Sequence, residues 1–262
     1  MTHCQTNLFQ RAGISARLSH YGPGLRMAAH EHGYHQLSCL LAGELRESHA
    51  AHDRDIHQPS LGVKPAGLSH TNEYGPNGAL ILSVNIDPDL ADPELAFCLA
   101  DWRWQAHAVP RGSLNSLLTL ANLLGGAAAE ADDVLADFLA VLTAEITVDP
   151  PRPASAIPDW LNEARDALRE SDAAPDLAAL AGEAGVHRVH FSRCFNRHFG
   201  VPPSLYRRRC RLARAIADMV QGASLADAAA GAGFADQSHF SRLAKAETGY
   251  TPGALQSILR AA

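Results

Sequence analysis

A short motif occurs twice in the C-terminal part of the chain. The segments GVHRVHFSRCFNRHFG (185–200) and GFADQSHFSRLAKAETG (233–249) share the core Phe-Ser-Arg. Matching residues recur 48 positions apart before this core and 49 positions apart from the core onward. The matched pairs are Leu177 and Leu225, Ala181 and Ala229, Gly185 and Gly233, Phe191 and Phe240, Gly200 and Gly249, and Pro203 and Pro252. We therefore expect two copies of one supersecondary unit.

Each copy has the pattern of a helix, a tight turn and a second helix. A small alanine lets the two helices approach, and the glycine four residues later accommodates the turn. In the first copy, Phe191, Phe195 and Phe199 recur every four residues and predict a buried helix face. Residues two positions away are rotated by about 200°, so Val189 and Arg193 are predicted to point outward. In the second copy the predicted inward residues are Phe240, Leu243 and Ala244.

Positive charge is concentrated in this same part of the chain. Residues 1–157 hold 9 Lys and Arg against 17 Asp and Glu, a net charge of −8, whereas residues 158–262 hold 13 against 11, a net charge of +2. The segment 187–214 contains eight arginines and no acidic residue. Within it begins a predicted helix, 204–221, that links the two copies, and we expect some of its arginines to contact phosphates.

Residues 158–262 resemble the paired helix-turn-helix DNA-binding domain of AraC-type transcriptional regulators, most specifically in GFADQSHFSR. The resemblance implies two recognition helices that enter successive major grooves of double-stranded DNA. Three positions depart from the family pattern: His187 replaces a frequent capping serine, and Ala244 and Thr248 replace aromatic residues. The DNA-binding residues that we expect are Arg188, Val189, Ser192, Arg193, Arg197, Gln237, Ser238, Ser241, Arg242 and Lys245.

Ten of the fourteen histidines lie before residue 158. His30 and His32 are two residues apart and would share one side of a strand, and His70 is a third candidate ligand. The residues around them alternate as β structure does, which predicts strands at 35–43, 44–50 and 79–86. Two histidines at this spacing are typical of a metal site, although buried histidines also serve simply as hydrogen-bonding groups.

This N-terminal part resembles the cupin β-barrel, in a first motif from Gly24 to Gly43 and a partial second motif at Pro65, Gly67 and His70. The resemblance implies that His30, His32, Gln36 and His70 converge inside the barrel. Such a set suits a divalent transition metal ion, namely zinc, iron, nickel or copper. A small organic effector in the barrel is the alternative, and so are histidines with a purely structural role.

The sequence thus predicts an α+β protein in three parts. Residues 1–147 form a cupin-like β-barrel with two accessory helices, within 112–147, that cover the sheet or mediate dimerisation. Residues 148–158 are a proline-rich linker, and residues 159–262 are an all-α domain with two helix-turn-helix units. Five scattered cysteines form no CxxC pair, which argues against a zinc ribbon or a disulfide framework.

The predicted function is a cytoplasmic, sequence-specific DNA-binding regulator controlled by a metal or small-molecule effector. No apolar run is long enough to cross a membrane, so no membrane partner is expected. The family resemblance implies contact with RNA polymerase, and together with the apolar stripes within 112–147 it favours a homodimer; activator and repressor both stay open. We predict no enzymatic activity, since no Ser-His-Asp set or phosphate-cradling loop occurs. Two alternatives remain: a metal-dependent cupin enzyme with a DNA-binding appendage, and a regulator controlled by a protein partner.

Overall fold

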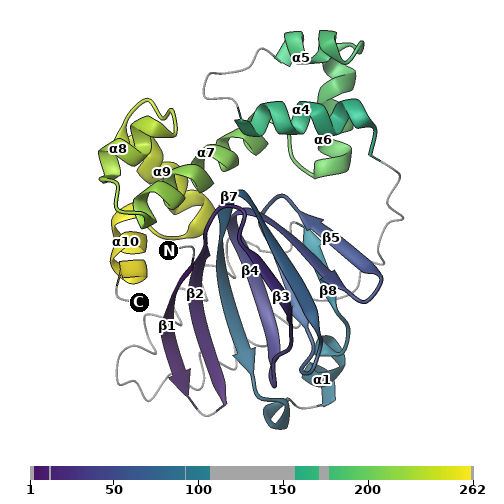
Figure 1. Cartoon of the computed structure of the whole chain (residues 1–262), viewed down its shortest axis with the longest axis vertical. Helices are drawn as coiled ribbons and strands as arrows, with labels where there is room; N and C mark the ends of the chain where they lie inside the picture. The colour runs from purple at the N-terminus through teal and green to yellow at the C-terminus, as the bar shows by residue number, and fades with distance from the viewer. Residues whose placement is uncertain (1–2, 12, 92, 107–156, 171–176, 261–262) are drawn as a thin grey trace.

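The computed structural model describes residues 3–11, 13–91, 93–106, 157–170 and 177–260. In this part of the chain the first region is an antiparallel sheet of eight strands, here called the sheet region (Figure 1). The strands are β1 (His3–Arg11), β2 (Ile14–Tyr21), β3 (Arg26–His30), β4 (His35–His49), β5 (His52–Ile56), β6 (Ser60–Lys64), β7 (His70–Ile86) and β8 (Arg103–Ala106).

The long strands β4 and β7 are at the centre of the sheet. Hydrogen-bonded neighbours follow the order β1-β2-β7-β4-β6-β8, while β3 also pairs with β7 and β5 with β4. The predicted strands 35–43 and 44–50 are one continuous strand that bends at Gly43. There φ is +90° and a Cβ atom would lie 2.0 Å from the carbonyl oxygen of Gly78, so the backbones approach too closely for a side chain. The predicted boundary between two strands is therefore a bend within one.

Alternation along the strands gives the sheet an apolar face and a second face, here called the polar face, whose polar side chains surround a cavity beside a smaller apolar cluster with Leu45, Tyr74 and Ile81. In β2, Ile14, Ala16 and Leu18 are buried in an apolar core, whereas Arg17 and Ser19 point to the opposite face and line a cavity. The apolar face packs against helices from the C-terminal part. The polar face is therefore left to enclose the cavity.

The C-terminal part is helical, and here it is called the helical region (Figure 1). Its helices are α4 (Asp159–Glu170), α5 (Leu177–Glu183), α6 (Arg188–Phe199), α7 (Pro203–Val220), α8 (Leu225–Gly231), α9 (Gln237–Thr248) and α10 (Pro252–Arg260). Helices α5 and α6 form the first unit and α8 and α9 the second, with α7 between them. The sheet region adds a short 3-10 helix, η1 (Pro88–Leu90), and α1 (Pro93–Leu99). The predicted α+β fold class and its two helix-turn-helix units are confirmed.

Several predictions concern residues outside the described ranges. The accessory helices within 112–147 and most of the linker 148–158 lie there, so the domain limits and the dimerisation surface stay predictions. No helix among the described residues is long and apolar enough to span a membrane. All five cysteines are free, and Cys39 and Cys210 are buried.

Two separate apolar cores hold the helices. One core joins sheet residues such as Leu18 and Leu82 to Ile216 of α7 and Phe240 of α9. The other contains Phe191 and further residues of α4, α5, α6 and the first half of α7, and it contains no strand residue. Helix α7 contributes to both cores and thereby connects the two units.

Candidate functional site

Helices α6 and α9 have well-formed ends at the same positions of the repeat. The imidazole of His187 accepts a hydrogen bond from the backbone N–H of Val189 at 3.3 Å, and the carboxylate of Asp236 accepts from the N–H of His239 at 2.6 Å. Gly200 and Gly249 end the helices in the left-handed conformation. His187 therefore performs the capping role that serine has in the family pattern.

The residues predicted to bind DNA lie on the outer faces of these two helices. Phe191, Phe195 and Phe240 are fully buried on the inner faces, as the spacing predicts. Val189, by contrast, is 50% exposed, which is unusual for a large apolar side chain and suits contact with a thymine methyl group. The exposed predicted residues are Arg188, Val189, Arg193, Arg197, Gln237, Ser238, Arg242 and Lys245, and the half-buried ones are Ser192 and Ser241.

Several arginines of α7 have internal partners. Arg209 forms an ion pair with Glu247 at 2.8 Å, and Arg211 donates to the carbonyl of Ala232 at 2.7 Å. Arg214 likewise donates to a backbone carbonyl of α4 at 3.1 Å. These three arginines fix α7 against its neighbours, whereas Arg208 is exposed. Among the α7 arginines, Arg208 is thus better placed to contact phosphates.

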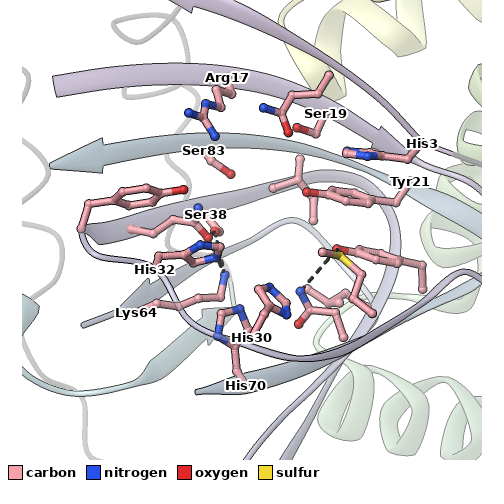
Figure 2. Close-up of a pocket in the computed structure, with 18 residues that line it drawn as sticks. His3, Arg17, Ser19, Tyr21, His30, His32, Ser38, Lys64, His70 and Ser83 are labelled. Atoms are coloured by element: carbon pink, nitrogen blue, oxygen red, sulfur yellow. Dashed lines mark hydrogen bonds between the residues drawn. The ribbon is translucent and has the colours of Figure 1, made fainter. Parts of the chain in front are cut away.

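The polar face of the sheet encloses a cavity of about 120 Å³, here called the inner cavity (Figure 2). It is lined by all three candidate histidines, by Gln36, by several hydroxyl groups and by the rings of Tyr21, Tyr34 and Tyr74. Figure 2 shows Arg17 on the side of the cavity opposite His30 and His70.

The three histidines predicted as metal ligands are brought together. Each of His30, His32 and His70 offers a ring nitrogen, and these atoms lie within 4.8 Å of one another. Nδ1 of His30 lies 2.8 Å from the carbonyl oxygen of Ala28, and Nδ1 of His70 lies 3.1 Å from that of Leu68. A carbonyl only accepts, so Nδ1 of each ring carries a proton, and Nε2 is the nitrogen left to bind a metal ion.

Burial keeps two of these rings neutral. It lowers the pKa of His32 to about 4, with further contributions from His70 and His30, and it also lowers the pKa of His70. Neutral imidazole is the form that binds a metal ion. His32 lies just beyond the end of β3, so the two histidines do not share one strand as predicted, yet their rings are 5.1 Å apart.

Gln36, the fourth predicted ligand, lines the same cavity but has other partners. Its amide oxygen accepts from Ser38 at 3.1 Å and from the ammonium of Lys64 at 3.2 Å, and its Nε2 donates to Asn85 at 3.0 Å. A metal ion would therefore compete with Lys64 for this oxygen, so a role for Gln36 as ligand stays a prediction.

A buried ion pair beside the cavity was not predicted from the sequence. Lys64 Nζ lies 3.1 Å from Glu47 Oε2, and the indole N–H groups of Trp102 and Trp104 donate to Glu47 Oε1 at 2.6 and 2.8 Å. Burial opposes the ionisation of Glu47, but Lys64 and the two indoles outweigh burial and lower the pKa of this carboxyl. Glu47 is therefore charged and neutralises Lys64.

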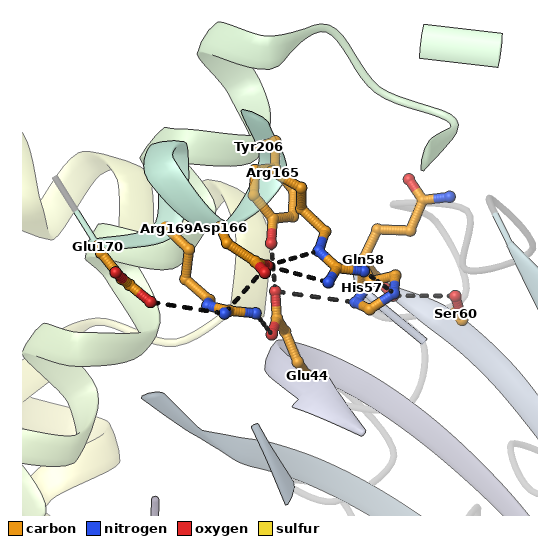
Figure 3. Close-up of polar contacts among 9 residues, drawn as sticks. All are labelled: Glu44, His57, Gln58, Ser60, Arg165, Asp166, Arg169, Glu170 and Tyr206. Carbon is orange, nitrogen blue, oxygen red and sulfur yellow. Dashed lines mark hydrogen bonds and ion pairs between the residues drawn. The ribbon is translucent and has the colours of Figure 1, made fainter. Parts of the chain in front are cut away.

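A second polar cluster joins the sheet region to the helical region (Figure 3). We call Glu44, His57, Arg165, Arg169 and Tyr206 the domain-contact cluster. The phenol of Tyr206 on α7 donates a short hydrogen bond to Glu44 Oε1, and Arg169 of α4 lies 3.4 Å from Glu44 Oε2. Arg165 lies 3.4 Å from His57 Nε2. Burial raises the pKa of Tyr206 far above its ordinary value, so the phenol keeps its proton.

The inner cavity and the domain-contact cluster are neighbours. Leu45 and Tyr74 line the inner cavity, and they also line a second cavity of about 410 Å³ that includes Glu44, Arg165 and Arg169. Successive residues of a strand point to opposite faces, so Leu45 and Glu44 face the two cavities from adjacent positions of β4. The two cavities are therefore lined by adjacent residues of β4.

Residues 180–257 match a family model described as a helix-turn-helix domain. Among solved structures, the chain is similar to ToxT from Vibrio cholerae, with 13% identity, a TM-score of 0.38 and coverage of 95% of this chain and 99% of that one. It is also similar to unsaturated fatty acid bound ToxT from the same species, with 12% identity, a TM-score of 0.37 and coverage of 100% and 95%. A cupin superfamily protein from Desulfitobacterium hafniense matches with 17% identity, a TM-score of 0.31 and coverage of 32% and 76%. No protein with a curated description matches the sequence.

Proposed function

We propose that this chain, whose residues 180–257 match a helix-turn-helix family model, is a sequence-specific transcriptional regulator of the AraC type controlled by an effector in its inner cavity. The observation that carries the proposal is the pair of capped helices, α6 and α9, with exposed polar and basic outer faces. The regulator acts in the cytoplasm on double-stranded DNA. We further propose that it is a homodimeric activator that contacts RNA polymerase.

Each unit supplies one arginine at the same repeat position for reading DNA. Arg193 of α6 and Arg242 of α9 are both exposed, and they follow the buried residues Phe191 and Phe240 by two positions. The planar guanidinium suits the O6 and N7 acceptors of guanine in the major groove. The two units are therefore expected to read base steps about one helical turn, or about 10 bp, apart.

The test begins with selection of a binding site for the full chain from random duplexes. In Arg193→Ala and Arg242→Ala we expect a loss of about 1–3 kcal/mol of discrimination, each at a different base step. The control is Arg26→Ala, because this arginine of β3 is exposed and lies in the sheet region. An unchanged base preference in both reading-helix variants contradicts the proposal.

The effector control is supported by the position of the domain-contact cluster. Glu44 is 7% exposed and binds both α7, through Tyr206, and α4, through Arg169. Occupation of the inner cavity moves Leu45 or Tyr74, and that displacement reaches Glu44 and the helices that hold the first unit. The effector thereby changes the geometry with which α6 and α9 meet DNA.

We also propose that His30, His32 and His70 hold one divalent transition metal ion, either zinc, iron, nickel or copper. The ring nitrogens already lie within 4.8 Å of one another, which is close enough for the three imidazoles to face one ion. Two of the rings already have the required tautomer, because their Nδ1 atoms donate to carbonyls. When bound, the metal would supply a Lewis-acidic contact for an effector.

Elemental analysis of untagged protein tests the metal site. We expect near-stoichiometric metal that is lost in His30→Ala/His32→Ala and kept in His52→Ala, since His52 is exposed on β5. Absence of bound metal after exposure to all four ions contradicts the metal site and leaves the histidines structural.

A further inference from the structure

The inner cavity has positively charged lining residues without a matching negative charge. Among the described residues that line it, Arg17 and Lys64 are cationic and none is a carboxylate. The cavity is small and lies between sheet strands, so its low-dielectric walls strengthen the field of these charges. The hydrogen-bond acceptors around Arg17 and Lys64 determine which of these two cations is available to a ligand.

Lys64 is fully committed to protein acceptors. An ammonium group has three N–H donors, and Nζ has three acceptors: Glu47 at 3.1 Å, Ser38 at 2.8 Å and Gln36 at 3.2 Å. Its charge is balanced by the carboxylate of Glu47, which lies outside the cavity lining. Lys64 therefore offers a ligand neither an unbalanced charge nor a free donor.

Arg17 is in the opposite situation. Its Nε is buried without a hydrogen-bond acceptor, and no carboxylate within the described ranges pairs with its guanidinium. The strand register places Arg17 beside Ser83 of β7, and Ser83 beside Ser38 of β4, so the arginine stands at the end of a row of hydroxyl groups. A buried N–H group without an acceptor is costly. The arrangement is that of a site where a ligand supplies the acceptor.

We propose that the inner cavity binds a small organic carboxylate, held by the guanidinium of Arg17, as the effector of this regulator. The planar fork of arginine matches the two oxygens of a carboxylate. The remainder of the ligand extends toward the histidines on the opposite side (Figure 2). A cavity of about 120 Å³ has room for about four water molecules at ~30 Å³ each, which limits the ligand to a small molecule. The inference rests on the proposed function, because it names the ligand class of the cavity assigned there.

The first experiment compares acetate with acetamide, which has nearly the same shape and no charge. Thermal unfolding of the full chain is followed at constant ionic strength with sodium chloride as the balancing salt. For a dissociation constant near 10 mM, about 100 mM acetate raises the melting temperature by roughly 3 °C or more. Acetamide is expected to give no such rise. Equal effects of acetate and acetamide overturn the proposal.

The variants assign the effect to Arg17. We expect Arg17→Gln to lose the stabilisation by acetate, and Arg17→Lys to retain a smaller part because it keeps the charge without the planar fork. The matched control is Arg26→Gln, whose arginine is exposed and paired with Glu73 at 2.7 Å. An acetate response of wild-type size in Arg17→Gln overturns the proposal.

A second measurement covers the case in which Arg17→Gln does not fold. Saturation-transfer NMR on the wild-type chain reports acetate directly, and competition by formate, but not by formamide, is expected at the same site. If the wild-type chain binds no acetate but still binds DNA sequence-specifically, the carboxylate effector is wrong and the proposed DNA-binding function is unaffected. If the wild-type chain shows no sequence-specific DNA binding, the proposed function itself is contradicted.

Discussion

The two helix-turn-helix units share their internal design but are attached to the sheet region in different ways. Phe240 of the second unit belongs to the same apolar core as Leu18 and Leu82 of the sheet, and α10 adds a hydrogen bond from Thr6 to the carbonyl of Ile258 at 2.7 Å. The core of the first unit contains no strand residue. Among the described residues, the first unit and its supporting helices meet the sheet mainly through the domain-contact cluster.

This difference assigns different roles to the units. An extended apolar contact is lost only when large surfaces separate, so the second unit moves and unfolds with the sheet region. A cluster of a few buried polar groups is sensitive to the loss of a single partner, because each group left unpaired is costly. We therefore expect the position of the first unit to be the more sensitive to changes in the sheet region.

The largest expected effect comes from the equivalent phenylalanines of the two copies. Both Phe191 and Phe240 are fully buried, so either change to alanine should cost about 3–5 kcal/mol of unfolding free energy. The two substitutions should, however, lower hydrogen-exchange protection in different parts of the molecule. In hydrogen exchange, Phe240→Ala is expected to lower protection in β2, β4 and β7, whereas Phe191→Ala should affect only α4, α5, α6 and the first half of α7. If both substitutions lower protection in the same strands and helices, the two units are not attached to the sheet region in different ways.

A smaller effect is expected when the domain-contact cluster loses one donor. Tyr206→Phe leaves the buried carboxylate of Glu44 without its phenol partner, at a cost of about 1–3 kcal/mol. Because the contact holds the first unit, hydrogen exchange in α4 and α6 should increase while α9 keeps its protection. Tyr250→Phe is the control, since this ring lies beside the second unit and packs against the shared apolar core. A change confined to α9 contradicts the assignment.

The smallest effect is expected from the ionisation of His57. Burial lowers the pKa of this imidazole below its ordinary value of 6.5, an effect that Arg165 reinforces and Glu44 opposes. The unfolded chain therefore binds the proton more readily, so the contribution to stability is complete above pH 6.5 and is lost as the pH falls below it. Urea unfolding at pH 7.5 and 5.5 measures this loss, which should be smaller in His57→Gln. If His57→Gln has the same pH dependence of stability as the wild type, the ionisation of His57 does not contribute to it.

The parts of the molecule that the sequence predicts are those with local signals. The recurring Phe-Ser-Arg core and the turn glycines Gly185 and Gly233 determine the two units, and helical periodicity determines their outer faces. The convergence of His30, His32 and His70 was expected from the cupin resemblance. In each case the residues belong to one motif or one periodic segment.

The parts that escaped prediction depend on pairing between distant segments. Glu44 and Tyr206 meet although 162 positions separate them, and neither residue has a neighbour in sequence that indicates the contact. Arg17 lies in the segment ISARLSHY (14–21), which forms β2 and is not among the strands that the sequence predicts. Its direction into the cavity depends on which face of the sheet the helices cover. That choice is made by tertiary packing.

The length of α7 has a consequence for the DNA that the protein selects. Its 18 residues rise about 27 Å, and both units are attached to this one rigid rod. Insertion of a single residue would rotate one reading helix by about 100° relative to the other, out of alignment with its groove. We therefore expect the spacing between the two DNA segments read by α6 and α9 to depend on the length of α7.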